Sequence, residues 1–359
     1  MAVAQSAGIT DIGRKRKGNE DSFFIDDDLR LYIVSDGMGG RQAGEVASRL
    51  VTETLRERMK RFLEKNDARD MADYDDSLST EGNYIIASIR HANNAVYQAA
   101  QDNEAYKGMG ATVSAVLVSD ETLIASNVGD SPIYLIRNGA IEDLFVPHTV
   151  MAEHQALAPK GAKKLGEQFK HMITRAMGIA ETVEPDIFEI QYFEGDVLLI
   201  CSDGLSDKVS TGEILALVSS AEPKKSCKAL VNLANERGGD DNITIITLKI
   251  DKIDVEEDTA KPPKNQRPLL MVEYDTEDTS YKGTVREIDT EGMFIETQEP
   301  FDIGQELMLT VSDQNDQQTL MATGKIVDRK PSGIKIELGK LNVQQKKTIK
   351  SFKTVFNKS

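Results

Sequence analysis

Short hydrophobic runs recur in the first part of the chain, at residues 31–34, 123–128 and 196–200. Each run is rich in aliphatic residues and is bounded by turn residues, which is typical of a buried β-strand. An aspartate stands within three residues of the end of each run: Asp36, Asp130 and Asp203. A further strand is predicted at 242–250, directly after Asp241. Acidic residues therefore mark one end of four predicted strands.

Helical periodicity is clearest at residues 42–63 and 84–100, where apolar side chains recur on one face. The polar stretch 64–82 between them is predicted to be an exposed loop. Ser210 begins a capping-box pattern that opens a short helix, and Pro223 suits the first turn of the next. Helices of this kind are expected to pack outside a core made mostly of strands.

The pattern changes to short alternating strands in the last third of the chain. Six are predicted, at residues 269–274, 281–288, 293–297, 307–311, 320–327 and 333–338. Six short strands separated by turns indicate a small closed barrel. A final helix at 343–356 places Ile349, Phe352 and Phe356 on one face, which would plug or flank that barrel.

A charged segment at 251–266 separates the two patterns. It contains Pro262 and Pro263 and has no apolar periodicity, which is typical of a linker. The length of 359 residues also favours two domains. We therefore expect a first domain at 1–250, a linker at 251–266 and a second domain at 267–359.

The aspartates at the strand ends predict a metal site. Strands that lie side by side bring their end residues together, and converging carboxylates repel one another unless cations lie between them. Asp36 taken alone would suit a helix cap or an Asp-Gly turn. The recurrence at Asp130, Asp203 and Asp241 favours metal binding.

The scarcity of nitrogen and sulfur ligands indicates which metal. The chain has four histidines and two cysteines, and Cys201 and Cys227 are far apart, so a zinc or redox site has no ligand set. Coordination by carboxylates and a backbone carbonyl suits Mn²⁺ or Mg²⁺. Gly37, which has no Cβ, would let its own carbonyl approach an ion closely.

A family resemblance rests on a series of motifs in the first domain. They lie at residues 13–16, 19–21, 35–40, 108–112, 129–131, 173–178, 202–204 and 241–242. Their order and spacing resemble those of the bacterial type-2C metal-dependent Ser/Thr protein phosphatases, the PPM family, over residues 8–250. The resemblance implies an α+β fold, a four-layer αββα sandwich.

The resemblance also implies a two-metal centre. Asp36 corresponds to the carboxylate that bridges two ions, with the carbonyl of Gly37 on one of them, and with Asp203 and Asp241 completing the other. A water that bridges two cations has a lowered pKa, so it can attack phosphorus directly, without a covalent enzyme intermediate.

Other residues match the surroundings of that centre. Glu20 and Asp21 resemble the outer carboxylates that hold metal-bound waters, and we count Asp21 among the metal-binding residues. Asp130 resembles a ligand of a third, weaker ion. Arg16 matches the arginine that grips the substrate phosphate, for which a planar two-pronged donor is suited. Without the motif, Arg16 would be a solvated member of the basic run 14–17.

The general acid has no assignment from the sequence. Met38 stands where animal relatives carry a histidine. His148 aligns with a family histidine at the start of the flap, residues 147–172, but a structural or exposed imidazole suits that position equally well. Cys201 lies in an apolar strand and is expected to be a buried structural cysteine.

The second domain resembles a PilZ domain, the bacterial receptor module for cyclic di-GMP. Its binding motifs are incomplete, because only Arg267 remains of the RxxxR stretch, with Pro263 four residues earlier. Glu287 and Asp289 occupy the D/NxSxxG stretch, where added negative charge would repel a dianionic ligand. We therefore expect no cyclic di-GMP binding and a barrel that contacts protein or dimerises.

The charge balance restricts the partners further. Residues 251–359 carry 16 basic and 20 acidic residues, and the remainder carries 27 and 39, so both parts are acidic, with net charges of −4 and −12. Nucleic acid is therefore not an expected partner. The chain has no apolar stretch of about 20 residues and no N-terminal signal pattern, so neither membrane insertion nor export is expected, and we predict a cytoplasmic protein.

The resulting hypothesis is a metal-dependent protein phosphatase that acts on phosphoserine and phosphothreonine, the products of a Ser/Thr kinase. Its cofactors would be two Mn²⁺ or Mg²⁺ ions with a third bound more weakly, and its second domain would regulate or localise it. The alternative is a pseudophosphatase scaffold or signalling adaptor that acts through the barrel. The complete set of Asp36, Asp203 and Asp241 favours the enzyme, since a scaffold does not need three costly carboxylates together.

Overall fold

The structure is a computed structural model that describes residues 2–39, 43–65, 74–120, 122–158, 165–166, 169–253, 270–275, 280–297, 299, 301–312 and 319–356. The chain divides into two compact units. The first comprises Met1–Tyr74 and Thr80–Asp258, and the second comprises Thr259–Ser359 with the short segment Asp75–Ser79.

Two antiparallel five-stranded sheets form the centre of the first unit. One has the order β1 (Ala2–Asp11), β12 (Ile243–Ile253), β11 (Val197–Cys201), β8 (Ile133–Arg137) and β9 (Ala140–Asp143). The other has the order β10 (Asp186–Ile190), β7 (Leu123–Val128), β6 (Val113–Val118), β3 (Leu31–Ser35) and β2 (Ser22–Asp26). A small ladder joins β4 (Gly37–Met38) to β5 (Gly110–Ala111).

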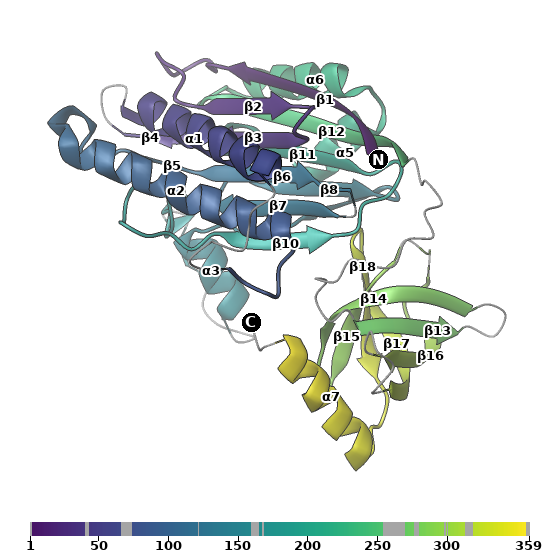
Figure 1. Ribbon diagram of the computed structural model, residues 1–359. Helices are drawn as coiled ribbons and strands as arrows, with labels where there is room; N and C mark the ends of the chain where they lie inside the picture. The colour runs from purple at the N-terminus through teal and green to yellow at the C-terminus, as the bar shows by residue number, and fades with distance from the viewer. Residues whose placement is uncertain are drawn as a thin grey trace. The chain divides into compact units, whose positions relative to one another are not determined.

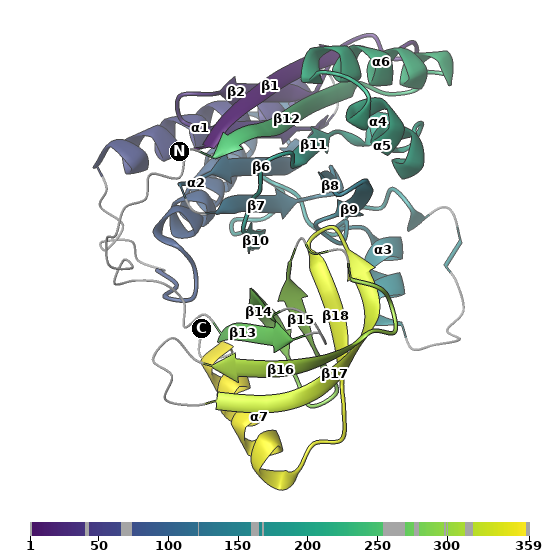
Figure 2. The same ribbon diagram turned by 90° about the vertical axis from the view of Figure 1, so that its right-hand side faces the viewer.

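Helices cover the outer face of each sheet. Figure 1 shows α1 (Ala43–Lys65) and α2 (Thr80–Asp102) over the sheet that contains β3 and β7. In Figure 2, the helices α4 (Asp203–Ser206), α5 (Thr211–Ser219) and α6 (Pro223–Glu236) lie on the side of the other sheet. Two short elements complete the unit, η1 (Glu104–Tyr106) and α3 (Val150–Leu157). The αββα sandwich implied by the family resemblance is therefore confirmed.

The strands are continuous apolar runs because both of their faces are buried. On β3, Leu31 and Ile33 join the core under α1 and α2, whereas Tyr32 and Val34 join the core between the two sheets. A third apolar cluster, which includes Leu199, lies between the other sheet and α5 and α6. Since successive side chains of a strand point to opposite faces, burial on both sides requires an unbroken apolar run.

Several predicted boundaries need correction. Both long helices extend beyond their predicted ends, to Lys65 and back to Thr80, so the loop between them is shorter than predicted. Strand β12 continues to Ile253, three residues into the expected linker, and residues 254–266 lie outside the described residues. Helix α5 follows Ser210, which donates its N–H to Glu213, and α6 begins at Pro223, as predicted.

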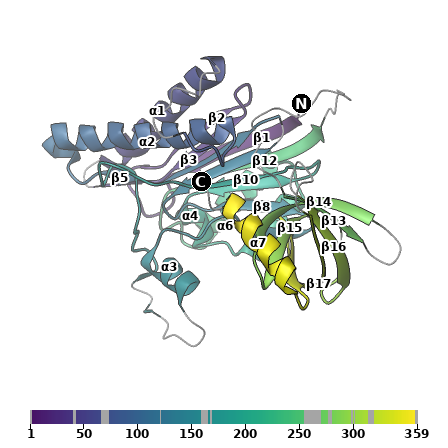
Figure 3. The ribbon, with the colours of Figure 1, turned by 60° about the horizontal axis from the view of Figure 1, so that its bottom comes forward.

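The second unit contains the predicted six-stranded closed barrel. Its strands follow the order β13 (Leu270–Asp275), β14 (Ser280–Ile288), β15 (Gly292–Glu296), β18 (Gly333–Leu338), β17 (Thr319–Lys330) and β16 (Glu306–Ser312). Helix α7 (Val343–Phe356) lies beside the barrel (Figure 3) and packs against β17 and β14. Its Ile349 and Phe352 side chains are buried. No helix among the described residues of either unit has the length and apolar character needed to cross a membrane.

Candidate active site

The predicted acidic residues of the first unit meet at one edge of the two sheets. Asp36 follows β3 and Asp130 follows β7 in one sheet, whereas Asp203 follows β11 and Asp241 precedes β12 in the other. Burial raises the pKa of Asp36 well above its ordinary value, and the negative charges of Asp21, Asp203, Asp241 and Asp130 raise it further. Both sheets therefore contribute carboxylates to a single cluster around Asp36.

The backbone around Asp36 is held tightly. The N–H of Asp36 donates to Oγ1 of Thr112 at 2.9 Å, and the N–H of Thr112 donates to the carbonyl of Asp36 at 2.8 Å. The N–H of Gly37 donates to the carbonyl of Glu20 at 3.1 Å. A Cβ at Gly37 would lie 2.1 Å from the carbonyl oxygen of Gly44, so this position accepts only glycine.

Asp21 is a buried carboxylate with one satisfied oxygen. Its Oδ2 accepts hydrogen bonds from Oγ of Ser202 at 2.8 Å and from Oγ1 of Thr244 at 2.6 Å. Its Oδ1 is buried without a hydrogen-bond donor among the described residues, beside the carboxyl of Asp36. Burial raises the pKa of Asp21 to about 6, although the two hydroxyls oppose that shift.

Asp203 begins the short helix α4 directly after β11. Burial is the main cause that raises its pKa to about 7, and the negative charges of Asp130 and Asp207 add to it. Burial likewise raises the pKa of Asp130. These carboxyls are held so close that full ionisation is unfavourable without cations nearby.

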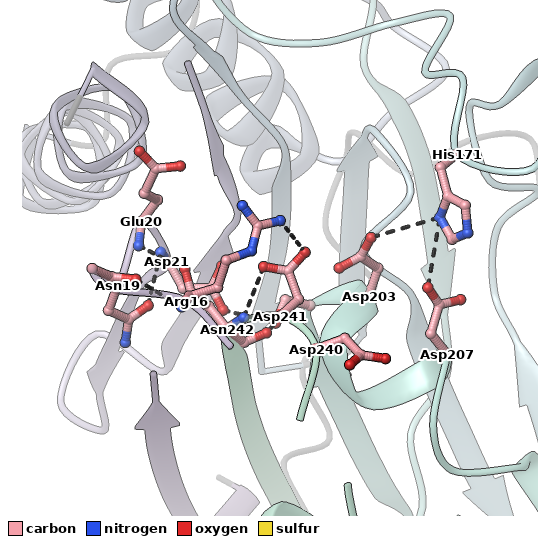
Figure 4. A network of polar contacts seen from close by, with 12 residues as sticks. Arg16, Asn19, Glu20, Asp21, His171, Asp203, Asp207, Asp240, Asp241 and Asn242 are labelled. Carbon is pink, nitrogen blue, oxygen red and sulfur yellow. Dashed lines mark hydrogen bonds and ion pairs between the residues drawn. The ribbon is translucent and has the colours of Figure 1, made fainter. Parts of the chain in front are cut away.

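Arg16 lies against this cluster at the surface. Its Nη2 is 2.6 Å from Oδ2 of Asp241, and half of its side chain is exposed (Figure 4). That hydrogen bond raises the pKa of the Arg16 guanidinium. Asn242 fixes the loop that carries Arg16, because its side chain accepts from the N–H of Glu20 and donates to the carbonyls of Ile12 and Gly18.

Glu20 lies at the margin of the cluster. Burial raises its pKa, and the positive charge of Arg16 opposes that shift. A Cβ at Gly44 would lie 2.8 Å from Cδ of Glu20, so the N-terminal turn of α1 is in close contact with this carboxyl. Glu20 therefore approaches the cluster from the side of α1.

Two further residues reach the cluster that sequence reasoning missed. His171 places Nδ1 at 4.0 Å from Oδ2 of Asp203 and at 3.6 Å from Oδ2 of Asp207 (Figure 4). The ligand atoms of these three side chains lie within 4.8 Å of one another, a spacing that a cation could bridge. The sequence position of Asp207 could have indicated its proximity to the cluster, because it lies four residues after Asp203 and therefore on the same side of a helical turn. No comparable signal pointed to His171.

A pocket of about 260 Å³ adjoins the cluster. Its polar lining includes Asp130, Asp203, Asp207, Lys170 and His171, and its apolar lining includes Pro147, Met151 and Ala152. Lys170 donates to Asp207 at 2.8 Å, so a residue of the flap segment closes one side of the pocket.

Two other residues considered from the sequence are buried. His148 is 2% exposed and hydrogen-bonded on both ring nitrogens, so its structural interpretation fits the geometry. Cys201 is fully buried, and burial raises the pKa of its thiol well above the ordinary value, which makes it a poor nucleophile.

The donor set fits divalent cations. The clustered side chains of Asp21, Asp36, Asp203 and Asp241 offer carboxylate oxygens, the metal ligands that Mg²⁺ and Mn²⁺ prefer. Asp21 offers a buried oxygen that has no hydrogen-bond donor among the described residues. The backbone of Gly37, next to Asp36, is fixed by its hydrogen bond to Glu20. Arg16 forms an ion pair with Asp241, and its single positive charge does not balance the four negative charges of these acids.

Sequence-family comparisons match both units. The family described as Protein phosphatase 2C matches residues 13–243, and the PilZ domain family matches residues 265–353. A putative protein phosphatase 2C-type from Streptococcus pyogenes is 35% identical over 257 residues, covering 69% of this chain and 98% of that protein. The Serine/threonine phosphatase stp of Listeria monocytogenes is 30% identical over 249 residues, covering 67% of this chain and 94% of that protein.

Solved structures agree with these matches. The serine/threonine phosphatase PstP/Ppp of Mycobacterium tuberculosis superposes with a TM-score of 0.59 at 31% identity, over 70% of this chain and all of that chain. A PstP catalytic domain in complex with two manganese ions superposes with a TM-score of 0.59 at 30% identity, over the same shares of the two chains. Both matches have the extent of the first unit.

Proposed function

The chain belongs to the protein phosphatase 2C family, and from this premise we propose that it hydrolyses phosphoserine and phosphothreonine in proteins by a two-metal mechanism. The observation that carries the proposal is the convergence of Asp21, Asp203 and Asp241 on Asp36. Buried carboxylates that repel one another destabilise a fold, and a scaffold or adaptor would gain nothing from keeping them.

Four groups would hold the two ions. Asp36 would bridge them, the carbonyl of Gly37 would bind one, and Asp203 and Asp241 would complete the other. When bound, Mn²⁺ or Mg²⁺ would supply a water activated near neutral pH for direct in-line attack on phosphorus. The tight backbone at Gly37 and Thr112 supports this assignment, because it fixes the backbone from which the Asp36 carboxylate and the Gly37 carbonyl would reach the ions.

The surrounding residues would keep this centre rigid and charged. Ser202 and Thr244 fix one oxygen of Asp21, which leaves the other oxygen directed to the cluster as an outer acceptor for bound water. Glu20 would act in the same way at the margin. Asp130 would bind a third ion more weakly, beside Asp203 and the pocket.

Arg16 would bind the phosphate of the substrate. Its guanidinium is half exposed and already close to Asp241, so it can reach an anion at the surface of the cluster. A planar, two-pronged donor matches the oxygens of a phosphoryl group better than a point charge does. The proposed substrates are phosphoproteins made by a Ser/Thr kinase.

The test is hydrolysis of a phosphothreonine peptide by the full-length protein. We expect phosphate release with Mn²⁺ or Mg²⁺, and its loss when EDTA is added in excess of the metal. A phosphotyrosine peptide of the same sequence serves as the matched substrate control and should be hydrolysed more slowly. Absence of metal-dependent release from the phosphothreonine peptide would contradict the proposed activity.

The barrel is proposed to contact protein or regulate the phosphatase without binding cyclic di-GMP. Oδ1 of Asp289 accepts hydrogen bonds from the N–H groups of Glu291 and Gly292, so its carboxylate caps a turn. Glu287 is exposed on the same hairpin, and Arg267 and Pro263 lie outside the described residues. Loss of one arginine contact and the added negative charge of these carboxylates should each weaken binding by about 1–3 kcal/mol.

Calorimetry on the full-length chain tests this expectation. Titration with cyclic di-GMP should give no binding isotherm at micromolar ligand, because penalties of this size move a micromolar site toward millimolar. A dissociation constant in the low micromolar range would contradict the interpretation of Glu287 and Asp289.

A further inference from the structure

His148 holds both backbone polar groups of one residue, Gly129, beside the cluster. Its Nδ1 accepts the N–H of Gly129 at 2.9 Å, and its own N–H donates to the carbonyl of Gly129 at 3.0 Å. The carbonyl of His148 accepts the N–H of Thr174 at 2.8 Å. The same buried residue, at the start of the flap segment, therefore connects the turn before Asp130 with Thr174, which follows the end of that segment.

The second ring nitrogen of His148 fixes its tautomer. Nε2 lies 3.1 Å from Oδ2 of Asp186, and Oδ1 of Asp186 accepts from Nη1 of Arg175 at 2.5 Å. Because Nδ1 accepts a backbone N–H, it carries no proton, and the ring proton must be on Nε2, where Asp186 accepts it. The imidazole is thus neutral and oriented by a carboxylate that is itself held by a guanidinium.

The turn at Gly129, which His148 holds from one side, packs tightly against Thr112 on the other. Gly129 has φ +114°, and a Cβ there would lie 2.6 Å from Cγ2 of Thr112. Thr112 is the residue that fixes the backbone of Asp36 through two hydrogen bonds. Gly129 is therefore wedged between Thr112 and His148, and the carboxylate of Asp130 follows directly from it.

We propose that His148 is a positioning residue that sets the place of the Asp130 carboxylate by accepting the N–H of Gly129 through an unprotonated Nδ1. It does not touch the reacting phosphate. This inference rests on the proposed function, in which Asp130 binds a third ion. The cost of losing the acceptor would appear as a displaced carboxylate and weaker binding of that ion.

Two substitutions at His148 separate its two hydrogen bonds. In His148→Asn, the amide oxygen takes the place of Nδ1 and retains the acceptor for Gly129. In His148→Gln, the amide reaches the place of Nε2 and leaves the N–H of Gly129 without its acceptor. The same pair of substitutions at His91, which is exposed on α2, provides a matched control.

Asp186→Asn offers a third variant that leaves the imidazole in place. Arg175 would bind the amide oxygen of the substituted side chain in the place of Oδ1, which turns the NH₂ group toward Nε2 of His148. The ring proton would then move to Nδ1, where it opposes the N–H of Gly129. We expect this variant to behave like His148→Gln although its shape is nearly unchanged.

Calorimetric titration of the metal-free full-length proteins with Mn²⁺ is the first measurement. We expect His148→Gln and Asp186→Asn to weaken the weakest Mn²⁺ step at least tenfold, and His148→Asn to stay within threefold of wild type. In peptide hydrolysis, kcat should fall in His148→Gln and Asp186→Asn much more than in His148→Asn, while KM changes less than twofold in all three. Wild-type Mn²⁺ affinities in folded His148→Gln and Asp186→Asn would overturn the proposal.

The ring nitrogens of His148 give a readout that needs neither metal nor activity. In ¹⁵N NMR spectra at pH 7.5, assigned by the signals missing in His148→Asn, we expect the proton on Nε2. A proton on Nδ1, or an imidazolium, would overturn the proposal even in a protein that hydrolyses phosphopeptides. Conversely, a protein without phosphatase activity but with this tautomer and metal dependence would contradict the proposed function alone.

Discussion

Two regions of the sandwich bury aspartates, one beside a buried arginine and the other beside further carboxylates. At the end of β8, Arg137 and Asp196 are each 2% exposed and form two hydrogen bonds, from Nε and Nη2, at 2.7 and 2.6 Å. The N–H of Phe193 adds a third hydrogen bond to Asp196, and the ring of Phe193 lies 4.6 Å from the guanidinium carbon. Around Asp36, several carboxylates gather with one exposed arginine in direct contact.

The difference shows how a structural acid differs from a functional one. Burial raises the pKa of Asp196, but the hydrogen bonds and charge of Arg137 lower it, so the fold itself supplies the cation. Around Asp36 both burial and neighbouring charges raise the pKa, so the cation must come from outside. Both kinds of aspartate border an apolar strand, and only the partner distinguishes them.

The largest expected effect is on catalysis at the carboxylate cluster. Asp36→Asn or Asp203→Asn should lower turnover about a thousandfold or more, because a lost ligand removes charge stabilisation and an activated water. Without metal, both variants should be at least as stable as wild type, since each removes a repelling charge. Steady-state hydrolysis and denaturant unfolding check the two statements.

Asp102→Asn, an exposed aspartate at the end of α2, is the control and should match wild type in both measurements. Near-normal turnover in Asp36→Asn or Asp203→Asn would contradict the two-metal assignment and remove the contrast with Asp196.

The next effect is on stability at the buried ion pair. Arg137→Met should lower the free energy of unfolding by about 3–5 kcal/mol, because it leaves Asp196 buried without its cation. The double variant Arg137→Met with Asp196→Leu should recover most of that loss, and the kcat of the folded protein should stay unchanged. A double variant as unstable as the single one would show that packing, not charge, holds this region.

A third prediction concerns Asp143, a mostly buried acid on β9 whose pKa burial raises to about 7. Between its ordinary pKa near 4 and about 7, the folded protein binds more protons than the unfolded chain. The free energy of unfolding should therefore fall as the pH rises through this window, by on the order of 4 kcal/mol at most for this group.

Asp143→Asn removes that contribution, so the stability of the variant relative to wild type should increase from pH 5 to pH 8. Urea unfolding at several pH values measures this difference, in which the titration of the carboxylate cluster is common to both proteins. A difference that stays constant with pH would mean that the Asp143 carboxyl has an ordinary pKa.

The smallest effect is expected at Arg16. Arg16→Ala should raise KM about tenfold and lower kcat much less, because its proposed partner is the phosphate of the bound substrate rather than a group formed during reaction. Arg14→Ala, in the same basic run, is the control with a small effect. An unchanged KM would place Arg16 with the solvated residues of that run.

Local patterns in the sequence were sufficient for the elements of the second unit, whereas in the first unit they predicted the strands β3, β7, β11 and β12 and the helices α1, α2, α5 and α6 but not the remaining strands. The six strands of the barrel and α7 were predicted nearly to their ends, because alternation of apolar and polar residues is visible within a few positions. Strand β1 was not predicted, since its Ala, Gly, Ser and Gln residues give a weak pattern. It forms by pairing along its whole length with β12, more than two hundred residues away.

The sequence by itself determined which acidic residues form the site, and the tertiary structure decided which side chains and backbone groups each of them contacts. Asp36, Asp203 and Asp241 stand out because strands end at them. By contrast, the approach of His171 to Asp207, the hydroxyls on Asp21 and the imidazole of His148 on Gly129 all join residues far apart in the chain. A local pattern carries no record of such pairs, because burial and charge compensation arise only when distant strands and loops pack together.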